Sequence, residues 1–505
     1  MHKSFFTRSL PALVVLVLAA CNNSKATHPA ASSAGDTQTL KVMSFNIEWG
    51  GTHVSFDKVV EAIQKADPDI VGIQEAEGNL QQLALRLGWH YDVRNYVISR
   101  YPLIDPPGAD GVYILVESSP GKVVAVADVH LPSDPYGPDY IRDGATPAEA
   151  MALEDTTRLP KIQPYITALP PLAARGIPVF VTGDFNAPSH TDWTETTAKT
   201  RPSVRYPFAW PVSSAMANAG FTDSWRSLHL DAAAEPGLTW WAARPPLPEY
   251  TPTAKDPSDR IDFVWFSGPA EAQASTIVGE PGASGVTISV DPWPSDHRSV
   301  LSTFSVKPAP LPAFVTSEHR VYHRGDNVAV RYSSSDGSEA QLTLIAVDRG
   351  GITVEPGVRP ADGHMLIPDG RLAPGHYRLS LARAGDQAPL TYDFWMARKD
   401  APPQVAVLAD HYAQGEPIGV RWQDAPGNRN DYVAIYPANE SAEYEGGLAW
   451  RYVNAMPAGE FTLDASTVDS GWPVPPGRYV AYLVKDDGYE SLAKSAEFTV
   501  TAAGQ

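Results

Sequence analysis

Residues 179–188 read VFVTGDFNAP, an apolar run that leads directly into a polar cluster. The run before Asp184 predicts a buried strand, because strands covered on both faces are nearly continuous hydrophobic stretches. Asp184 and Asn186 then lie at the end of that strand, on the same side of an extended chain. A carboxylate and an amide placed there can orient a water molecule and donate to an oxyanion.

Five further motifs share this design, with polar residues at one end of a predicted apolar strand. They are Asn46 in KVMSFNIEWGG, Glu75 in DIVGIQEAE, His130 in VVAVADVHLP, Asp262 in DRIDFVWF, and Asp296 with His297 in WPSDHRSV. Strands of one sheet share an edge, so a sheet can bring these side chains to a common rim. This rim is the predicted active site.

The residue types at the rim fit metal-assisted cleavage of a phosphoester. The reaction needs a cation for the phosphate oxygens, a group that orients or deprotonates water, and donors for developing charge. Glu75 is a hard oxygen ligand of the kind that Mg²⁺ accepts, and Asp184 can act on the water. The histidines can carry protons or positive charge to the phosphate, while neighbouring aspartates fix their tautomers. We therefore expect direct attack of water without a covalent nucleophile.

Each motif also has a simpler structural explanation when it is taken alone. Asp184 and Asn186 can cap backbone groups in a turn. A histidine at a strand end can be structural, Glu75 can be a solvated strand end, and Asp262 can pair with Arg260. The coincidence of six such motifs in one chain favours an active site.

Together the motifs resemble those of the endonuclease/exonuclease/phosphatase superfamily, which has the deoxyribonuclease I-like fold. The resemblance covers roughly residues 38–307, and GDFN followed by SDH, with QE upstream, is a specific combination. It implies a four-layer α/β sandwich and a Mg²⁺-dependent hydrolase of phosphoester bonds, with Mn²⁺ as a substitute. On the metal side, the resemblance implies that Glu75 is the ligand, that Asn46 supports the metal or the phosphate, and that Asp296 lies beside the metal.

The resemblance also implies roles on the substrate side. Asp184 would orient the water, Asn186 would contact the phosphate, and His297 would bind the scissile phosphate. Asp262 would orient a histidine. His130 matches the histidine variant of the family, which is typical of deoxyribonuclease I-like and sphingomyelinase-like members, and this favours substrates other than abasic DNA.

Three other side chains are candidates for substrate contact. Arg158 lies in a predicted helical stretch, residues 148–169, that is broken near two of its prolines. It could reach phosphate, although such an arginine is more often a surface or ion-pair residue. Trp240 and Trp241 could stack on a base, a sugar or an acyl group, or pack beneath their loop.

Composition indicates a modular, acidic protein. The chain has 505 residues and a formal net charge of −19 at pH 7. This length exceeds what one core normally supports, so two to four domains are expected. The negative charge disfavours tight nonspecific binding to nucleic acid, because few phosphates would be neutralised, but a local basic groove remains compatible with it.

The N-terminus has the features of a targeting segment. A basic start precedes an apolar core at residues 10–18, which is too short for a lasting membrane span, and LAAC follows at residues 18–21. This tetrapeptide resembles the lipobox of bacterial lipoproteins, which implies lipidation of Cys21; a chance cysteine near an ordinary cleavage site is the alternative. Asn22 after it favours the outer membrane. We expect an exported, lipid-anchored protein that faces the periplasm or the cell surface.

The C-terminal part contains a repeated unit. YHRGDNVAVRY at 322–332 parallels YAQGEPIGVRW at 412–422, and LAPGHYRLSL at 372–381 parallels VPPGRYVAYL at 474–483. The first pair is offset by 90 residues and the second by 102, which indicates a 12-residue insertion. Alternating apolar residues with Gly/Pro turns predict two small β-sandwiches that look immunoglobulin-like.

The chain is thus predicted to contain five segments, of which the two modules are expected to fold separately from the catalytic domain. They are a lipoprotein signal peptide at 1–20, a flexible tether at 21–38, a catalytic domain at 39–307, and β-sandwich modules at 312–398 and 403–501.

Three classes of function remain open. The first is an extracytoplasmic phosphodiesterase acting on nucleic acid or nucleotides. The second is a sphingomyelinase-like, phospholipase-like or inositol-phosphatase-like hydrolase. The third is a noncatalytic surface binding protein, which the intact Glu75, Asp184, Asn186 and His297 argue against. The expected partners are a phosphoester substrate, either nucleic acid or phospholipid, and the membrane through the lipid anchor; no obligate protein partner is evident.

Overall fold

The computed structural model describes residues 37–502 apart from 246–256, 360–361, 369, 384, 386–387, 443–446 and 469–470. Thr37–Gln505 form one compact unit. The predicted signal peptide, Cys21 and nearly all of the predicted tether lie outside the described residues. Within the described residues, no helix combines the length and the apolar character needed to span a bilayer.

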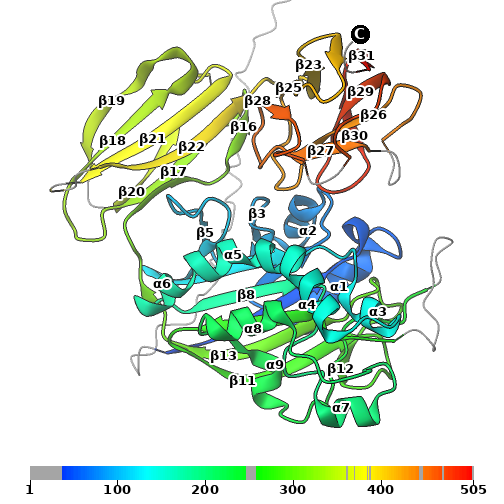
Figure 1. Ribbon diagram of the computed structural model, residues 1–505. Helices are drawn as coiled ribbons and strands as arrows, with labels where there is room; N and C mark the ends of the chain where they lie inside the picture. Colours follow the sequence, from blue (N-terminus) through cyan, green and yellow to red (C-terminus); the bar gives the residue numbers. More distant parts are fainter. Residues whose placement is uncertain are drawn as a thin grey trace, which may run out of the picture. The chain divides into compact units, whose positions relative to one another are not determined.

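Two mixed sheets form the centre of the first part of the chain (Figure 1). Their strands are β1 Gln38–Asn46, β2 Ile70–Gln74, β3 His90–Asp92, β4 Val97–Ser99, β5 Leu103–Ile104, β6 Ile114–Ser119, β7 Lys122–His130, β8 Val179–Asp184, β9 Thr222–Asp223, β10 Asp262–Ser267, β11 Ala270–Gly279, β12 Val286–Ser289, β13 Ser299–Val306 and β14 Ala309–Pro310. The first sheet has the order β12-β11-β13-β1-β2-β4-β3. The second has the order β5-β6-β7-β8-β10-β9, with β14 paired to β7.

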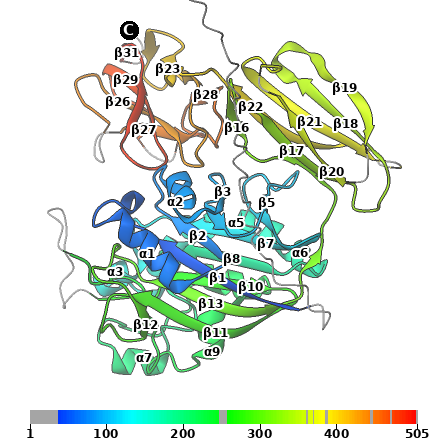
Figure 2. The same ribbon diagram turned by 180° about the vertical axis from the view of Figure 1, so that it is seen from behind.

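Helices cover the outer faces of both sheets (Figures 1 and 2). The helical elements are η1 Trp49–Gly51, α1 Phe56–Ala66, α2 Leu80–Leu87, α3 Gly137–Arg142, α4 Pro147–Thr156, α5 Arg158–Ala168, α6 Pro170–Ala174, α7 Glu195–Thr200, α8 Pro211–Asn218 and α9 Ser224–Leu228. Helices α1 and α2 pack on the outer face of the first sheet and α5, α6 and α8 on that of the second, whereas α9 contacts strands of both sheets. The sequence predicts a break near Pro160 and Pro164, but the structure has it earlier, at Thr157 between α4 and α5. Both prolines lie within α5. Pro160 lies in the first turn of α5, where a missing N–H removes no helical bond.

Three clusters of buried apolar side chains hold these layers together. Ile63 of α1 packs in one cluster with Ile73 of β2, and Ile162 of α5 packs in another with Val181 of β8. The third cluster lies between the sheets and includes Phe180 of β8, whose ring centroid is 4.8 Å from that of Phe304 in β13. The order helix, sheet, sheet, helix confirms the predicted four-layer α/β sandwich.

The two sheets approach closely beneath the predicted rim. A Cβ atom on Gly72 of β2 would lie 1.9 Å from Oγ1 of Thr182 and 2.2 Å from Oδ1 of Asp128. The same Asp128 Oδ1 accepts hydrogen bonds from Nε2 of Gln74 at 2.6 Å and from Oγ1 of Thr182 at 2.7 Å. Only glycine leaves room for this polar connection, which ties the ends of β2, β7 and β8 together.

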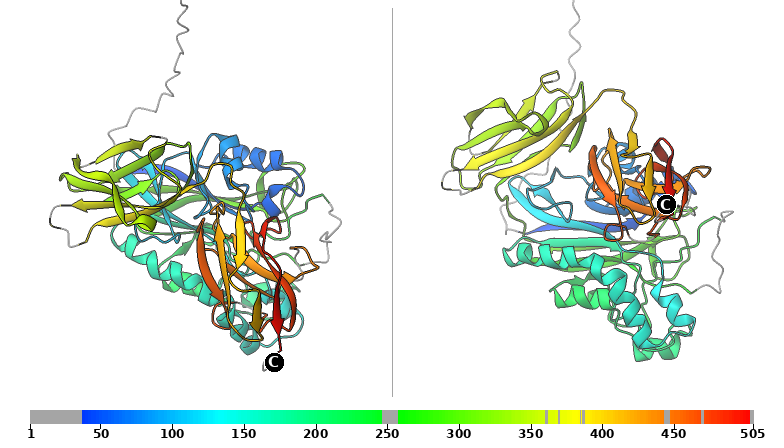
Figure 3. Two further views of the ribbon diagram at one scale, coloured as in Figure 1. Left: turned by 90° about the horizontal axis from the view of Figure 1, so that it is seen from above. Right: turned by 45° about the horizontal axis from the view of Figure 1, so that its top comes forward.

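The remaining strands form two β-sandwich modules (Figure 3). The first has β15 Phe314–Ser317, β16 Val321–His323, β17 Val328–Ser333, β18 Ala340–Ala346, η2 Val347–Arg349, β19 Gly351–Arg359, β20 Asp362–Ile367, β21 Gly375–Arg383 and β22 Leu390–Ala397. The second has β23 Gln404–Val407, β24 His411–Ala413, β25 Ile418–Gln423, β26 Tyr432–Pro437, β27 Ala449–Tyr452, β28 Gly459–Leu463, β29 Gly477–Val484, β30 Ser491–Lys494 and β31 Phe498–Thr501. Each module encloses its own apolar cluster.

The predicted repeat is visible in equivalent sheets and equivalent side-chain bonds. Sheets β15-β17-β20 and β16-β22-β21-β18-β19 correspond to β23-β25-β28 and β24-β31-β29-β26-β27, with β30 added beside β29. The hydroxyls of Tyr322 and Tyr412 each accept from the backbone N–H three residues earlier, at 3.0 Å. The hydroxyls of Tyr377 and Tyr479 each donate to the carbonyl four residues earlier, at 2.7 and 2.8 Å. The prediction of two related β-sandwiches is confirmed.

Candidate active site

The predicted rim residues lie at neighbouring strand ends. Asn46, His130 and Asp184 are the last residues of β1, β7 and β8, whereas Asp262 is the first residue of β10. In the second sheet, Asp184 is in register with His130 on the parallel side and with Asp262 on the antiparallel side. Glu75 directly follows β2. The pair Asp296 and His297 precedes β13, so the structure brings the six motifs to one place.

Oδ2 of Asp184 is the centre of this cluster. The Nε2 atoms of His130 and His297 each lie 3.7 Å from it. Two amide nitrogens also face it, Nδ2 of Asn46 at 3.1 Å and Nδ2 of Asn186 at 3.3 Å. One carboxylate oxygen is thus surrounded by donors from four strand ends or the loops next to them.

His297 is held in its charged form by a buried carboxylate. Its Nδ1 atom lies 3.0 Å from Oδ2 of Asp262, and both side chains are buried. Burial alone would lower the pKa of His297, but the charges of Asp262, Asp184 and Asp296 hold it well above its ordinary value. Burial raises the pKa of Asp184 to about 6, although the charge on His297 opposes the rise. The site therefore pairs an imidazolium with a weakly basic carboxylate.

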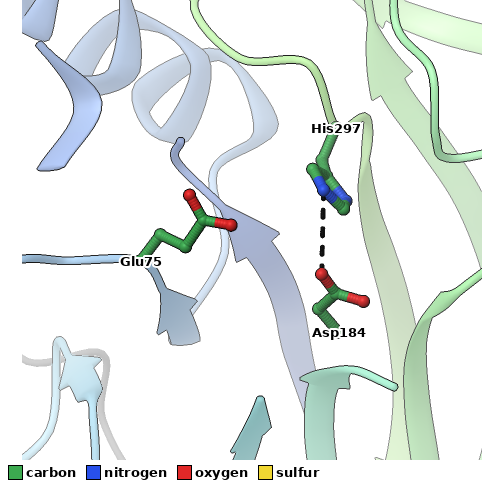
Figure 4. Close-up of side chains that lie close together, drawn as sticks. All are labelled: Glu75, Asp184 and His297. Carbon is green, nitrogen blue, oxygen red and sulfur yellow. Dashed lines mark ion pairs between the residues drawn. The ribbon is translucent and has the colours of Figure 1, made fainter. Parts of the chain in front are cut away.

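Glu75, Asp184 and His297 could together hold a metal ion, because each offers a ligand atom within 4.8 Å of the others (Figure 4). Burial would raise the pKa of Glu75, but the charges of the two site histidines and two hydrogen bonds lower it below its usual value. Glu75 is therefore ionised at neutral pH. A protonated imidazole has no free lone pair, so the carboxylates, rather than His297, are the candidate ligands for a divalent cation.

Asn46 and Asn186 hold the carboxylates in place. Asn46 donates through Nδ2 to Oε1 of Glu75 at 2.9 Å, and its Oδ1 accepts from the backbone N–H of Glu48 at 3.0 Å. Asn186 donates through Nδ2 to the carbonyl of Leu131 at 2.9 Å. Both amide nitrogens are engaged within the protein. In this structure the two asparagines orient the carboxylates through their Nδ2 atoms. The contacts with metal or phosphate that the resemblance implies for them stay predictions.

Asp296 and Trp240 form one wall of the site. Nε1 of Trp240 donates to Oδ2 of Asp296 at 3.2 Å, and the Trp240 ring lies 6.2 Å from that of His297. Oδ1 of Asp296 is buried without a hydrogen-bond partner and lies 3.9 Å from Nε2 of His297. Trp241 stacks on Trp240 with ring centroids 3.7 Å apart. Trp240 thus touches the rim directly, whereas Trp241 supports it.

The prediction that Arg158 binds substrate is wrong. Its side chain is fully buried beside Glu154, to which Nη1 donates at 2.8 Å. Its Nη2 atom donates to the carbonyls of Ser133 at 3.2 Å and Pro135 at 2.8 Å. The guanidinium therefore fixes the loop after β7 and has no path to a phosphate.

Arg260 is not the partner of Asp262. It donates to Asp192 at 3.0 and 2.8 Å and to Asp223 at 2.7 Å, and all three side chains are buried. Arg260 lies two residues before Asp262, the first residue of β10. The simpler explanation of Asp262 as an ion-pair partner of Arg260 is therefore excluded, and its carboxylate is committed to His297.

Sequence reasoning missed two buried acids beside the rim. Glu48 accepts from the backbone N–H of Asp296 at 3.0 Å and pairs with Arg244 at 2.6 Å. Burial and the charge of Asp296 raise its pKa to about 7. Burial raises the pKa of Asp128 to about 8. Glu48 comes two residues after Asn46, and Asp128 comes two residues before His130. Residues at this spacing lie on the same side of an extended chain, so the sequence could have predicted that both acids lie near the rim.

Comparison with known proteins agrees with this geometry. Residues 43–297, half of the chain, match the endonuclease/exonuclease/phosphatase family. The uncharacterized protein F14F9.5 of Caenorhabditis elegans is 28% identical over 303 residues, covering 54% of this chain and 94% of the worm protein. The structure of D. rerio TDP2 with a single-stranded DNA product is 16% identical, with a TM-score of 0.32, and covers 53% of this chain and 99% of that one. The Bacteroides thetaiotaomicron mannosyl-6-phosphatase Bt3783 is 14% identical, with a TM-score of 0.30, and covers 52% and 99%. The chain belongs to the endonuclease/exonuclease/phosphatase family, whose members are generally phosphoester hydrolases.

Proposed function

We propose that this protein is a metal-dependent phosphodiesterase that hydrolyses its substrate by direct attack of water. One observation carries the proposal. Oδ2 of Asp184 lies 3.7 Å from the Nε2 atoms of both His130 and His297, in the space that the carboxylate of Glu75 also faces. A base, two cationic or proton-carrying groups and an anionic metal ligand are the parts that phosphoester hydrolysis needs.

In the proposed reaction, each of four side chains has a separate role. A divalent cation held by Glu75, Mg²⁺ with Mn²⁺ as a substitute, would neutralise charge on the phosphate oxygens. Asp184 orients the water and accepts its proton, because a carboxyl with a pKa of about 6 is a competent base at neutral pH. His297 presents its proton on Nε2 to the negative phosphate oxygens. His130 is partly exposed and stands on the other side of Asp184, where it can reach the leaving group.

A substrate panel on purified protein tests the proposal. The panel contains plasmid DNA, RNA, bis(p-nitrophenyl) phosphate, sphingomyelin and inositol phosphates, each with Mg²⁺, with Mn²⁺ and with EDTA. Turnover is expected with either metal and should stop in EDTA. Asp184→Asn and His297→Ala should each lower kcat by about 10² to 10⁴. Asp57→Asn, the same chemical change at an exposed position of α1, is the matched control.

The same panel separates the alternatives. Preference for sphingomyelin or inositol phosphates would identify a phospholipase-like or phosphatase-like hydrolase within the same mechanism. Full turnover after exhaustive chelation would contradict the metal-dependent mechanism. Absence of turnover on every substrate would leave a noncatalytic binding protein.

We further propose that the protein is exported and anchored in the outer membrane by a lipid on Cys21. The LAAC sequence at residues 18–21 supports this proposal. Mass spectrometry of the mature N-terminus should find a lipidated cysteine, and Cys21→Ser should block lipidation and so abolish lipid-based anchoring. An unmodified Cys21, or cleavage at another position, would refute the anchor.

A further inference from the structure

The second β module reaches the active-site rim through the loop that follows β29, residues 485–489. Asp486, which is buried, accepts from the backbone N–H of Gly78 at 2.6 Å, and its other oxygen bonds the hydroxyl of Tyr96. Gly78 stands three residues after Glu75, the candidate metal ligand. This loop is therefore fixed to the segment that carries the metal ligand.

A second loop of the same module, before β26, fixes the strand that carries His130. Nη1 of Arg429 donates to the carbonyl of Asp128 at 3.1 Å, and its guanidinium lies over the ring of Tyr96 at 5.5 Å. The pairing of β6 with β7 extends only to Val126, so the Asp128 carbonyl lies on a free edge of β7. A buried carbonyl needs a donor. Arg429 at 3.1 Å and, more distantly, the hydroxyl of Tyr165 at 3.4 Å donate to it where the neighbouring strand does not, and Arg429 also bonds that hydroxyl. These contacts place the second module against the strands that carry rim residues.

The fixed loop places aromatic and acidic groups beside the metal ligand. The ring of Tyr489 lies 6.2 Å from that of Trp49, which is 41% exposed and whose backbone N–H donates to Glu75 at 3.0 Å. A Cβ atom on Gly488 would lie 3.5 Å from Oε2 of Glu77, so that side chain faces the loop. Burial, together with the charges of Glu75, Asp486 and Asp487, raises the pKa of Glu77 to about 8, so the negative charge of the loop comes from Asp487.

Asp487 adds an exposed negative charge at the same place. Its carboxylate accepts from the hydroxyl of Tyr452 at 2.6 Å and from Nδ2 of Asn430 at 2.5 Å, so its position is defined by its own module. The cation of this loop, Lys485, is paired with Glu490 at 2.9 Å. The wall beside the metal ligand is therefore aromatic and net negative.

We propose that loop 485–489 is a specificity-determining wall of the active site, selecting phosphoesters whose non-phosphate part carries no further negative charge. Aromatic faces accept apolar or cationic groups. The carboxylate of Asp487 repels the flanking phosphates of a polyanionic strand. The inference rests on the proposed phosphodiesterase function and narrows its substrate class.

The test compares kcat/KM of the full chain, with Mg²⁺, on three probes. p-Nitrophenyl phosphorylcholine has a cationic end, bis(p-nitrophenyl) phosphate has an uncharged end, and a fluorogenic single-stranded oligodeoxynucleotide is a polyanion. The wild type should prefer the first two probes. Asp487→Lys reverses one charge of the wall and should raise the ratio of oligonucleotide to phosphorylcholine kcat/KM about tenfold, mainly through KM.

The control is Glu460→Lys, which makes the same charge change on β28 of the same module, where Glu460 pairs with Arg421 at 2.7 Å. Its probe ratio should equal that of the wild type. A purely structural role of Asp487 would lower all three rates together and leave the ratio unchanged, which would overturn the proposal. A wild-type preference for the oligonucleotide would overturn it as well.

The two proposals fail in different ways. If no probe is turned over with metal, the proposed phosphodiesterase function fails. The wall is then tested by calorimetry, which measures the affinities of unlabelled phosphorylcholine and of the oligonucleotide. Asp487→Lys should raise the ratio of oligonucleotide affinity to phosphorylcholine affinity above that of the wild type.

Discussion

Asp262→Asn tests whether a buried carboxylate keeps His297 charged during turnover. The substitution keeps the shape of the side chain and removes its negative charge, 3.0 Å from Nδ1 of the imidazole. Because Asp262 holds the pKa of His297 above its ordinary value, the wild-type histidine stays protonated through neutral pH. The variant should lose that proton at a lower pH.

The magnitude follows from the separation of the two charges. Two unit charges about 4 Å apart at an effective dielectric constant of about 20 interact by about 4 kcal/mol, or about 3 pKa units. Asp184 and Asp296 still face His297 in the variant and retain part of the effect. We therefore expect a decrease of about 1 to 3 units. An amide can also stabilise the wrong tautomer, so kcat at neutral pH should fall by about 10² to 10⁴.

The assay is the pH dependence of kcat/KM on a soluble phosphodiester with saturating Mg²⁺. Protonated His297 is the active form, so activity falls on the alkaline side, and this limb should move to lower pH in Asp262→Asn. Asp223→Asn removes a buried carboxylate that faces Arg260 at 2.7 Å, and should leave the limb in place. An alkaline limb that stays fixed or moves upward in Asp262→Asn would refute the reasoning.

Three further predictions concern metal affinity, pH-dependent stability and the ion-pair network. Glu75→Gln removes an anionic ligand and should raise the Mg²⁺ concentration for half-maximal activity at least about tenfold, so an unchanged metal titration would contradict this ligand assignment. Burial raises the pKa of Asp128 to about 8, whereas the unfolded chain releases this proton near the ordinary value, about 3.9. The free energy of unfolding should therefore fall as pH rises between these values, and Asp128→Asn should weaken that dependence in urea titrations; equal slopes would argue against it. Arg260→Met removes a positive charge that pairs with the buried carboxylates of Asp192 and Asp223, and it should lower the free energy of unfolding by about 3 to 5 kcal/mol. Chemical denaturation measures this change, and a loss below about 1 kcal/mol would show that the ion pairs contribute little to stability.

The rim could be predicted from sequence because it depends on strand ends. An apolar run locates a buried strand, and the polar residue that ends it must lie at a sheet edge. Asp184 shows this most clearly, since its strand pairs in register with the strands of His130 and Asp262. The fold class followed from the same pattern and from the resemblance that the motifs carried.

The orientation of individual polar groups could not be predicted in the same way. Arg158 looked available because helical periodicity does not say whether an arginine has a buried carboxylate one turn away, as Glu154 provides. The sequence also could not show that Nδ2 of Asn46 donates to both Glu75 and Asp184, because the orientation of an amide depends on all of its partners. The contacts of Asp486 and Arg429 join segments far apart in the chain, and no local pattern reports them.

The bond between Asp486 and Gly78 joins residues 408 positions apart. A chain synthesised from its N-terminus presents both sheets and every rim residue before Asp486 exists. Closing a loop of that length is entropically costly and comes late, whereas the local strand pairs form early. Assembly is then ordered in time: the rim residues come together first, and loop 485–489, the proposed specificity wall, joins them later.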